Sequence, residues 1–193
     1  NHEVLLNNHF SKLQIRYQQS IYEKYGAGAI YSGVNGQWIS PVNKHLAIDH
    51  MVHFGLDPNK ADSISLPFNI NDIESTAATG VFDNVESMHK AKEELPLDWI
   101  IHVYEEESIR MDVHLPGITK GSSCMFLVDH IGIEHHDSYA FGDGVNDIEM
   151  LELVGHGVAM GNAIDEVKKI ANFVAKSIEE DGLANSFEEL FDL

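Results

Sequence analysis

The segment at residues 138–147 constrains the fold more than any other part of the chain. A short apolar run ends at Phe141 and is followed at once by the sequence GDGVND at residues 142–147. This order predicts a strand, a tight glycine turn and then the start of a helix. In an open parallel sheet, ligands bind beyond the carboxyl ends of the strands. We therefore expect Asp143 to lie where chemistry takes place.

The same loop offers two carboxylates, Asp143 and Asp147, spaced four residues apart. Mg²⁺ takes oxygen ligands, usually one or two carboxylates together with water and substrate phosphate. Asn146 and Asp147 enter the following helix, and the first N–H groups of a helix favour anions. The loop therefore suits a magnesium site, although a glycine-rich loop with a capping Asp is a structural alternative that the spacing alone leaves open.

Lys120 lies at the predicted start of another helix, which Thr119 caps and which runs to Ile131. A positive charge at this end of a helix opposes the helix dipole. Such a mismatch is tolerated when an anion lies between the two, and a transferring phosphoryl group is an anion of this kind. A solvated surface lysine is the simpler alternative.

Helix and strand patterns alternate regularly after Asp112, which is typical of a parallel, doubly wound α/β sheet. The preceding part has a different pattern, with two strands that form a predicted antiparallel hairpin. The expected helices there are 10–25, 46–54 and 85–95, the expected strands are 29–31, 64–68, 99–104 and 109–113, and residues 72–79 are ambiguous.

The composition excludes several classes of partner and setting. The chain has 193 residues, enough for one large or two small domains, and a formal net charge of −19. This charge argues against binding to nucleic acid and to an anionic membrane, both of which require a basic surface. The single cysteine, Cys124, excludes an internal disulfide and a multi-cysteine zinc site. With no apolar stretch near the roughly 18 residues of a membrane span and no signal peptide, the expected setting is a reduced cytoplasm.

Three ordered motifs resemble the haloacid dehalogenase (HAD) superfamily, and most closely its Cof-type sugar-phosphatase-like branch. They are ITKG at 118–121, YAFGDGVNDIEML at 139–151 and GVAMGNA at 157–163. The resemblance implies a Rossmann-like core with a parallel sheet, incomplete at its amino terminus, and an inserted α+β cap of the C2 class. It further implies three parts: residues 1–37 as a remnant of the first half of the core, 38–112 as the cap and 113–193 as the second half of the core.

The resemblance also implies a Mg²⁺-dependent hydrolysis of phosphate monoesters, such as sugar phosphates and other small phosphorylated metabolites, through an aspartyl-phosphate intermediate. Lys120 matches the family lysine that steadies the nucleophile and the phosphoryl oxygens. Asp143 matches a carboxylate that binds Mg²⁺, and Asp147 matches a second acidic position that supports the metal through water or orients Lys120. Asn146 matches a residue that contacts phosphate or metal-bound water, and Asn162 shapes the adjacent loop.

One expected motif is absent from the chain. The family nucleophile lies in an amino-terminal Asp-x-Asp-Gly-Thr motif, but the first aspartate here is Asp49, inside a predicted helix. Three explanations stay open: a fragment of an active phosphatase, which the start at Asn1 favours; a pseudo-enzyme that binds phosphorylated ligands or a protein partner; or a replaced amino-terminal part. In each case we expect the chain alone to have little or no phosphatase activity, and its oligomeric state is not predicted.

Overall fold

The computed structural model describes residues 4–106 and 108–191, which form two compact units. The first unit is Asn1–Pro116 and the second is Gly117–Leu193. In the described part of the chain, no helix combines the length and the apolar character needed to cross a membrane.

The first unit contains a six-stranded mixed sheet with the strand order β3-β2-β1-β4-β6-β5. Neighbouring strands are antiparallel, except that β2 and β3 are parallel. The strands are β1 (Gly28–Gly33), β2 (Gly36–Ile39), β3 (Ser65–Leu66), β4 (Ala77–Val81), β5 (Ile100–Tyr104) and β6 (Arg110–His114). The helices are α1 (Lys12–Lys24), α2 (Lys44–His53), α3 (Ala61–Ile64) and α4 (Val85–Glu94), with a 3₁₀ turn at Pro58–Lys60.

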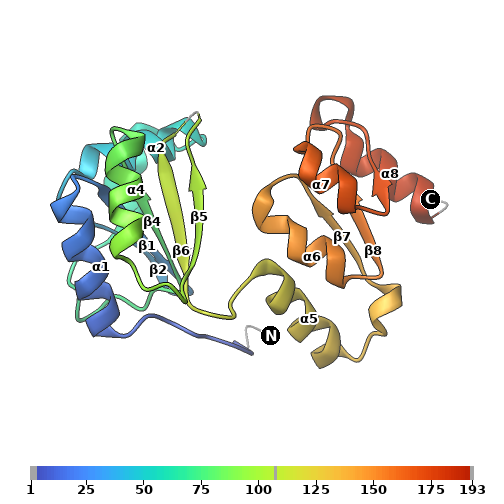
Figure 1. Ribbon diagram of the computed structural model, residues 1–193, viewed down its shortest axis with the longest axis horizontal. Coiled ribbons are helices and arrows are strands. Elements are labelled where there is room, and N and C mark those ends of the chain that lie inside the picture. Colours follow the sequence, from blue (N-terminus) through green and yellow to red (C-terminus); the bar gives the residue numbers. More distant parts are fainter. Residues whose placement is uncertain (1–3, 107, 192–193) are drawn as a thin grey trace. The chain divides into compact units, whose positions relative to one another are not determined.

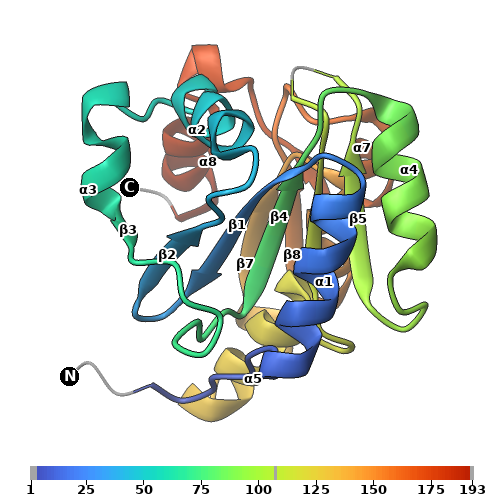
Figure 2. The ribbon, with the colours of Figure 1, turned by 90° about the vertical axis from the view of Figure 1, so that its left-hand side faces the viewer.

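Helices α1 and α4 pack on one face of this sheet (Figure 2). Tyr22 of α1 is fully buried, and its ring lies directly over Gly80 of β4, where an added Cβ would approach the ring to 2.6 Å. Met88 of α4 and Met111 of β6 are also fully buried in this core. Because the sheet is apolar on this side, α1 and α4 can bury their apolar stripes against it.

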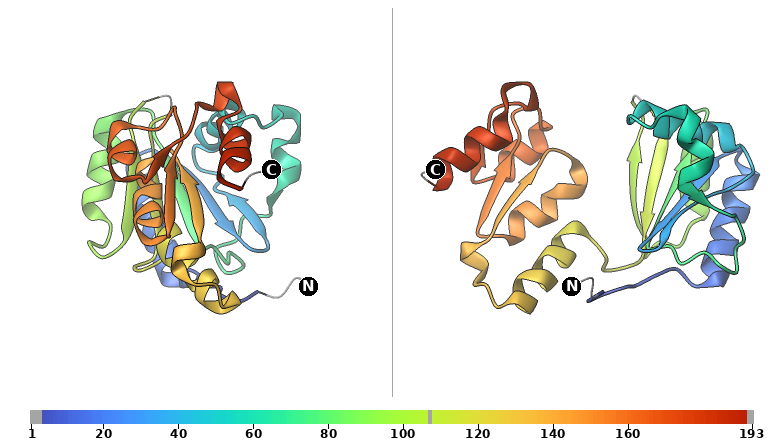
Figure 3. Two further views of the ribbon diagram at one scale, coloured as in Figure 1. Left: turned by 90° about the vertical axis from the view of Figure 1, so that its right-hand side faces the viewer. Right: turned by 180° about the vertical axis from the view of Figure 1, so that it is seen from behind.

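The second unit contains a parallel three-stranded sheet with the order β7-β8-β9 (Figures 1 and 3). Its strands are β7 (Tyr139–Gly142), β8 (His156–Ala159) and β9 (Phe173–Val174). Its helices are α5 (Lys120–Ile131), α6 (Ile148–Leu153), α7 (Asp165–Ile170) and α8 (Gly182–Phe191), with 3₁₀ turns at His135–Asp137, Val145–Asp147 and Ile178–Glu180.

The two faces of the parallel sheet are covered by different helices. Ala140 of β7 packs in a cluster with Leu151 of α6 and Val167 of α7. The neighbouring strand position, Phe141, stacks on Phe187 of α8 with ring centroids 5.3 Å apart. Successive strand residues point to opposite faces, so β7 lies between α6 and α7 on one side and α8 on the other.

The structure places the boundary between units at Pro116 and Gly117. The sequence predicted a domain boundary between residues 37 and 38. In the structure this position lies inside the β1–β2 hairpin, whose two strands pair with each other in one unit. Strand β1 also pairs with β4, so residues 28–33 belong to the same sheet as residues 77–114. The ambiguous segment 72–79 overlaps the start of β4, a central strand. The residues of β4 are mostly small, so the sequence shows no clear alternation of apolar and polar side chains there.

Candidate active site

Lys120 is the first residue of α5, and the preceding Thr119 fixes the start of this helix. The hydroxyl of Thr119 accepts a hydrogen bond from the backbone N–H of Ser122 at 2.9 Å, and the Ser122 hydroxyl accepts one from the Thr119 N–H at 2.9 Å. This reciprocal capping box satisfies two N–H groups that the helix itself leaves unpaired. It also holds the backbone from which the Lys120 side chain extends.

The Lys120 ammonium group donates a hydrogen bond to Oδ1 of Asp147, with Nζ and Oδ1 2.5 Å apart. The other carboxylate oxygen of Asp147 accepts hydrogen bonds from the backbone N–H groups of Asp143 at 3.0 Å and Gly144 at 3.1 Å. The Asp147 side chain is only 4% exposed, whereas that of Lys120 is 51% exposed. Asp147 therefore ties a half-exposed lysine to the glycine turn.

This arrangement depends on a close approach at Gly142, the last residue of β7. A Cβ atom at this position would lie 2.4 Å from the Cβ of Asp147, well inside any real contact. A second close approach occurs at Gly121, where a Cβ would lie 2.7 Å from Cγ of Glu149 on α6. The two glycines let the start of α5 and the turn after β7 approach one another closely enough for Lys120 to reach Asp147.

Asp143 follows the carboxyl end of β7 and is exposed. Its backbone carbonyl accepts a hydrogen bond from the N–H of Ile164 at 3.2 Å. Its carboxylate lies beside Asn162, whose side-chain amide reaches Oδ2 at 3.5 Å, while the Asn162 carbonyl oxygen accepts from the N–H of Ile178 at 3.2 Å. Asn162 thus links the Asp143 loop to the 3₁₀ turn before α8.

Asn146 is partly buried in the 3₁₀ turn that follows Gly144. Its side-chain oxygen lies close to Gly144, where a Cβ would come within 3.1 Å of it. The structure therefore brings all four predicted site residues, Lys120, Asp143, Asn146 and Asp147, to one loop region at the carboxyl end of β7.

Burial raises the pKa of the Asp147 carboxyl, but the hydrogen bonds from Lys120, Gly144 and Asp143 outweigh burial and hold the pKa below its ordinary value. The ionised form therefore contributes stability that is fully present above the ordinary carboxyl pKa and is lost as the pH falls through the lowered pKa of the folded state.

We expect this linkage to appear when the wild-type chain is compared with Asp147→Asn by urea unfolding across the acid range. The difference in free energy of unfolding should be largest near neutral pH and should shrink as the pH falls below about 4. The Asn variant cannot titrate at this position, so the comparison cancels the other carboxylates. A difference that does not change with pH would contradict the assignment.

The loop after β7 carries carboxylate groups of the kind that bind Mg²⁺. Asp143 presents an exposed carboxylate, and Mg²⁺ commonly takes one or two carboxylates with water and phosphate oxygens completing its shell. Over residues 4–106 and 108–191, no group of three or more His, Cys, Asp or Glu side chains is arranged to hold a metal by itself. The residues present thus fit a Mg²⁺ that takes its remaining ligands from water, phosphate and further carboxylates.

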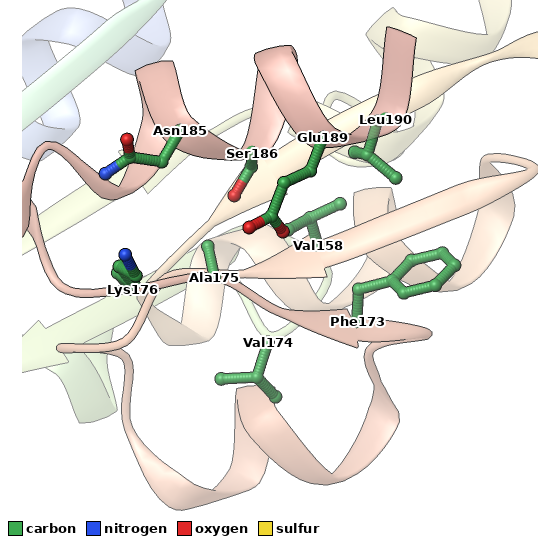
Figure 4. A pocket seen from close by; sticks show the side chains of 9 residues that line it. All are labelled: Val158, Phe173, Val174, Ala175, Lys176, Asn185, Ser186, Glu189 and Leu190. Atoms are coloured by element: carbon green, nitrogen blue, oxygen red, sulfur yellow. The ribbon is translucent and has the colours of Figure 1, made fainter. Parts of the chain in front are cut away.

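A separate hollow of about 200 Å³ lies elsewhere in the second unit, between α8 and the segment around β9 (Figure 4). Ser186 and Glu189 point from α8 toward Val158, with Phe173 at one end of the hollow. None of the four predicted site residues lines it. This hollow is therefore separate from the Lys120–Asp147 pair.

Comparisons with known proteins show the family of the chain. The family model for haloacid dehalogenase-like hydrolases matches residues 1–187. A protein from the pdhA 5′ region of Geobacillus stearothermophilus is 46% identical over 82 residues, which cover 42% of this chain and 86% of that protein. The 5-amino-6-(5-phospho-D-ribitylamino)uracil phosphatase YitU of Bacillus subtilis is 47% identical over 77 residues, 40% of this chain but only 28% of YitU.

Among solved structures, the HAD subclass IIB sugar phosphatase BT4131 matches the fold with a TM-score of 0.74 and 23% sequence identity. The match covers 100% of this chain and 71% of that protein. The α/β class predicted from the sequence is confirmed, and so is the resemblance that the three motifs carried.

Proposed function

The chain belongs to the haloacid dehalogenase-like hydrolases, and we propose that it supplies the lysine and magnesium-binding part of a phosphate-monoester hydrolase. The observation that carries this proposal is the Lys120–Asp147 pair, held at 2.5 Å beside the exposed Asp143. A buried carboxylate fixes the lysine, and the lysine keeps half of its side chain exposed to meet an anion. Such preorganised charge stabilises a transferring phosphoryl group without reorganisation during the reaction.

In this proposal the four residues have separate roles. Asp143 binds Mg²⁺, which when bound neutralises phosphate charge. Lys120 binds the phosphoryl oxygens and the attacking carboxylate. Asp147 positions Lys120, and because its own oxygens are already occupied by Lys120 and two backbone N–H groups, it would support a bound Mg²⁺ only through water. Asn146 donates from its amide to phosphate or to metal-bound water.

The second unit then corresponds to the second half of a HAD core, and the first unit to a cap of the C2 class. Its mixed sheet, with α1 and α4 on one face and α2 on part of the other, has the α+β composition of such a cap. Under this assignment the cap includes β1 and extends to Pro116, instead of spanning residues 38–112 as the motifs predicted. The parallel sheet of the second unit would be one part of a larger core sheet.

The proposed substrates are small phosphorylated metabolites, such as sugar phosphates and the phosphates of related polyols. YitU is named for a ribityl phosphate substrate, and BT4131 is named as a sugar phosphatase. The acidic chain, with its net charge of −19, needs a local cation to accept an anionic substrate. Lys120 and a Mg²⁺ at Asp143 would together provide that charge.

A second candidate is a pseudo-phosphatase that binds a phosphorylated ligand or a protein without turnover. The observation that favours it is the absence of an Asp-x-Asp sequence anywhere in the 193 residues. Both candidates use the same phosphate-binding loop, so they differ only in whether an attacking carboxylate joins it.

The test is phosphate release from sugar phosphates and p-nitrophenyl phosphate by the chain itself and by a chimera. The chimera joins this chain to the residues of BT4131 that precede the segment matched by the whole of this chain. We expect no release by the chain alone and Mg²⁺-dependent release by the chimera. Turnover by the isolated chain that Asp143→Ala abolishes would contradict our assignment of the missing nucleophile, and an inactive but folded chimera would favour the pseudo-phosphatase.

A further inference from the structure

The hollow between α8 and the segment around β9 is apolar at one end (Figure 4). Phe173 and Leu190 lie together at that end, and Val158 of β8, which is almost fully buried, lines the hollow from the sheet. Phe173 is 47% exposed, so the hollow leaves apolar surface open to a ligand. Its volume of about 200 Å³ is smaller than the roughly 300–1,000 Å³ of sites for drug-sized ligands, which limits the ligand to a few non-hydrogen atoms.

The opposite end of the hollow carries charges of both signs. Lys176, which follows β9, lies at this end together with Asn185 of α8, and Glu189 of α8 extends its carboxylate over the middle of the hollow (Figure 4). Over residues 4–106 and 108–191, neither the Lys176 ammonium nor the Glu189 carboxylate forms an ion pair, with each other or with another side chain. Both charges are therefore available to a ligand.

The backbone that carries Lys176 is held in place by close contacts with two glycines. The carbonyl of Lys176 accepts a hydrogen bond from the N–H of Gly161 at 3.0 Å. An added Cβ at Gly161 would lie 2.6 Å from the carbonyl carbon of Lys176, and one at Gly182 would lie 2.0 Å from its carbonyl oxygen. Because this backbone is fixed before a ligand arrives, little ordering is needed on binding.

Helix α8 presents its polar side chains from equally fixed positions. The Asn185 side-chain amide donates one hydrogen bond of 2.7 Å to the carbonyl of Glu180, which leaves its second N–H for a ligand. The buried Ser186 hydroxyl donates to the carbonyl of Gly182 at 2.8 Å and can still accept a hydrogen bond. Glu189 lies four residues after Asn185, so the two side chains are neighbours on one side of the helix. The helix thus offers a donor and a carboxylate side by side.

These groups select the chemistry of the ligand. Lys176 and Asn185 suit a carboxylate, since both donate hydrogen bonds. Glu189 suits a cation and repels a ligand that carries only negative charge. A purely apolar molecule would cover both charges without replacing their contacts with water. An α-amino acid near neutral pH carries a carboxylate and an ammonium group on one carbon, and an apolar side chain on that carbon would match the apolar end of the hollow.

We propose that this hollow binds a free α-amino acid with an apolar side chain, such as leucine. The ligand carboxylate meets Lys176 and Asn185, its ammonium group meets Glu189, and its side chain packs against Phe173 and Leu190. None of the four candidate site residues lines the hollow, so the proposal does not depend on the phosphatase function.

The experiment is a titration of the isotope-labelled chain with leucine, followed by amide-resolved NMR. We expect saturable shifts at the amides of Ala175, Lys176, Ser186 and Glu189. Three related molecules each lack one of the recognised groups: 4-methylpentanoate lacks the ammonium group, 3-methylbutylamine lacks the carboxylate and glycine lacks the apolar side chain. Each should bind about tenfold more weakly than leucine or worse, because a charge-assisted hydrogen bond or the apolar contact is lost.

Two variants test the charged residues individually. Lys176→Gln and Glu189→Gln keep most of the side-chain size, and each should lower the affinity for leucine about tenfold. Lys176→Gln should bind 3-methylbutylamine like the wild type, since this ligand has no carboxylate to lose. The matched controls are Lys169→Gln and Glu188→Gln, at exposed positions outside the hollow, and both should bind leucine like the wild type.

The absence of saturable shifts around the hollow would overturn the proposal. Equal affinities for leucine, 4-methylpentanoate and 3-methylbutylamine would also overturn it, because the hollow would then accept any small apolar molecule. The same conclusion would follow if Glu188→Gln weakened leucine binding as much as Glu189→Gln. Phosphate release by the chimera has no bearing on these results, so a failure of the proposed function would be seen separately.

Discussion

Replacing Lys120 with Ala in the active chimera is expected to lower kcat by about 100- to 1000-fold, the usual cost of removing one group that stabilises transition-state charge. The variant loses the only partner that the structure gives to Oδ1 of Asp147 in the described residues. It also loses the cation that meets the phosphoryl oxygens. The measurement is the initial rate of phosphate release at saturating Mg²⁺ and substrate.

The matched control is Lys169→Ala, which removes an exposed lysine from the last turn of α7. Lys169→Ala changes the net charge by the same amount as Lys120→Ala. If the rate depends on the position of Lys120 and not on the total charge of the chain, Lys169→Ala should retain the wild-type rate. Equal losses in both variants would mean that general electrostatics of an acidic chain explain the effect, and the site assignment would fail.

Replacing Asp147 with Ala is expected to lower the free energy of unfolding of the second unit by about 2 to 3 kcal/mol. The backbone N–H groups of Asp143 and Gly144 lose their acceptor in a partly buried turn. The half-exposed Lys120 can turn to water, so its loss contributes little to this number. Chemical unfolding followed by a probe in the second unit measures the change.

Two further variants serve as comparisons for Asp147→Ala. Asp147→Asn keeps the shape and one acceptor for the backbone N–H groups, so it should cost less than Asp147→Ala. Glu152→Ala, at an exposed position on α6, should change the free energy by no more than about 0.5 kcal/mol. If Asp147→Ala is as stable as Glu152→Ala, the turn does not depend on this carboxylate.

The local structure around the candidate site residues could be predicted from the sequence because its signals are local. Thr119 before Lys120 is a capping pattern, and Gly142 before Asp143 marks a turn at a strand end. The sequence left two roles open for Asp147, metal support or orientation of Lys120. The geometry supports the orientation of Lys120, because Asp147 bonds directly to the lysine and to two backbone N–H groups. These contacts depend on how the folded chain packs, so residue spacing alone could not distinguish the two roles.

The first unit was harder to predict because its organisation depends on pairing between distant strands. The strands near residues 30, 80 and 112 belong to one sheet, but only the hairpin of β5 and β6 is visible as a local pattern. The residues that lead into β4 are small and polar, so they show neither the alternation of a strand nor the period of a helix. The contact between Thr79 and Asp112, separated by 33 positions, could therefore not be read from the sequence.

We propose that the loop around Asp143 binds Mg²⁺ and phosphate together with Lys120. The most direct measurement is an NMR titration of the chain with Mg²⁺, orthophosphate and both, repeated on Asp143→Ala. We predict saturable shifts at the amides of Lys120, residues 143–147 and Asn162, with phosphate binding strengthened by Mg²⁺ only when Asp143 is present. Unshifted amides, or an Asp143→Ala variant that behaves like the wild type, would mean that this loop does not bind Mg²⁺ and phosphate together.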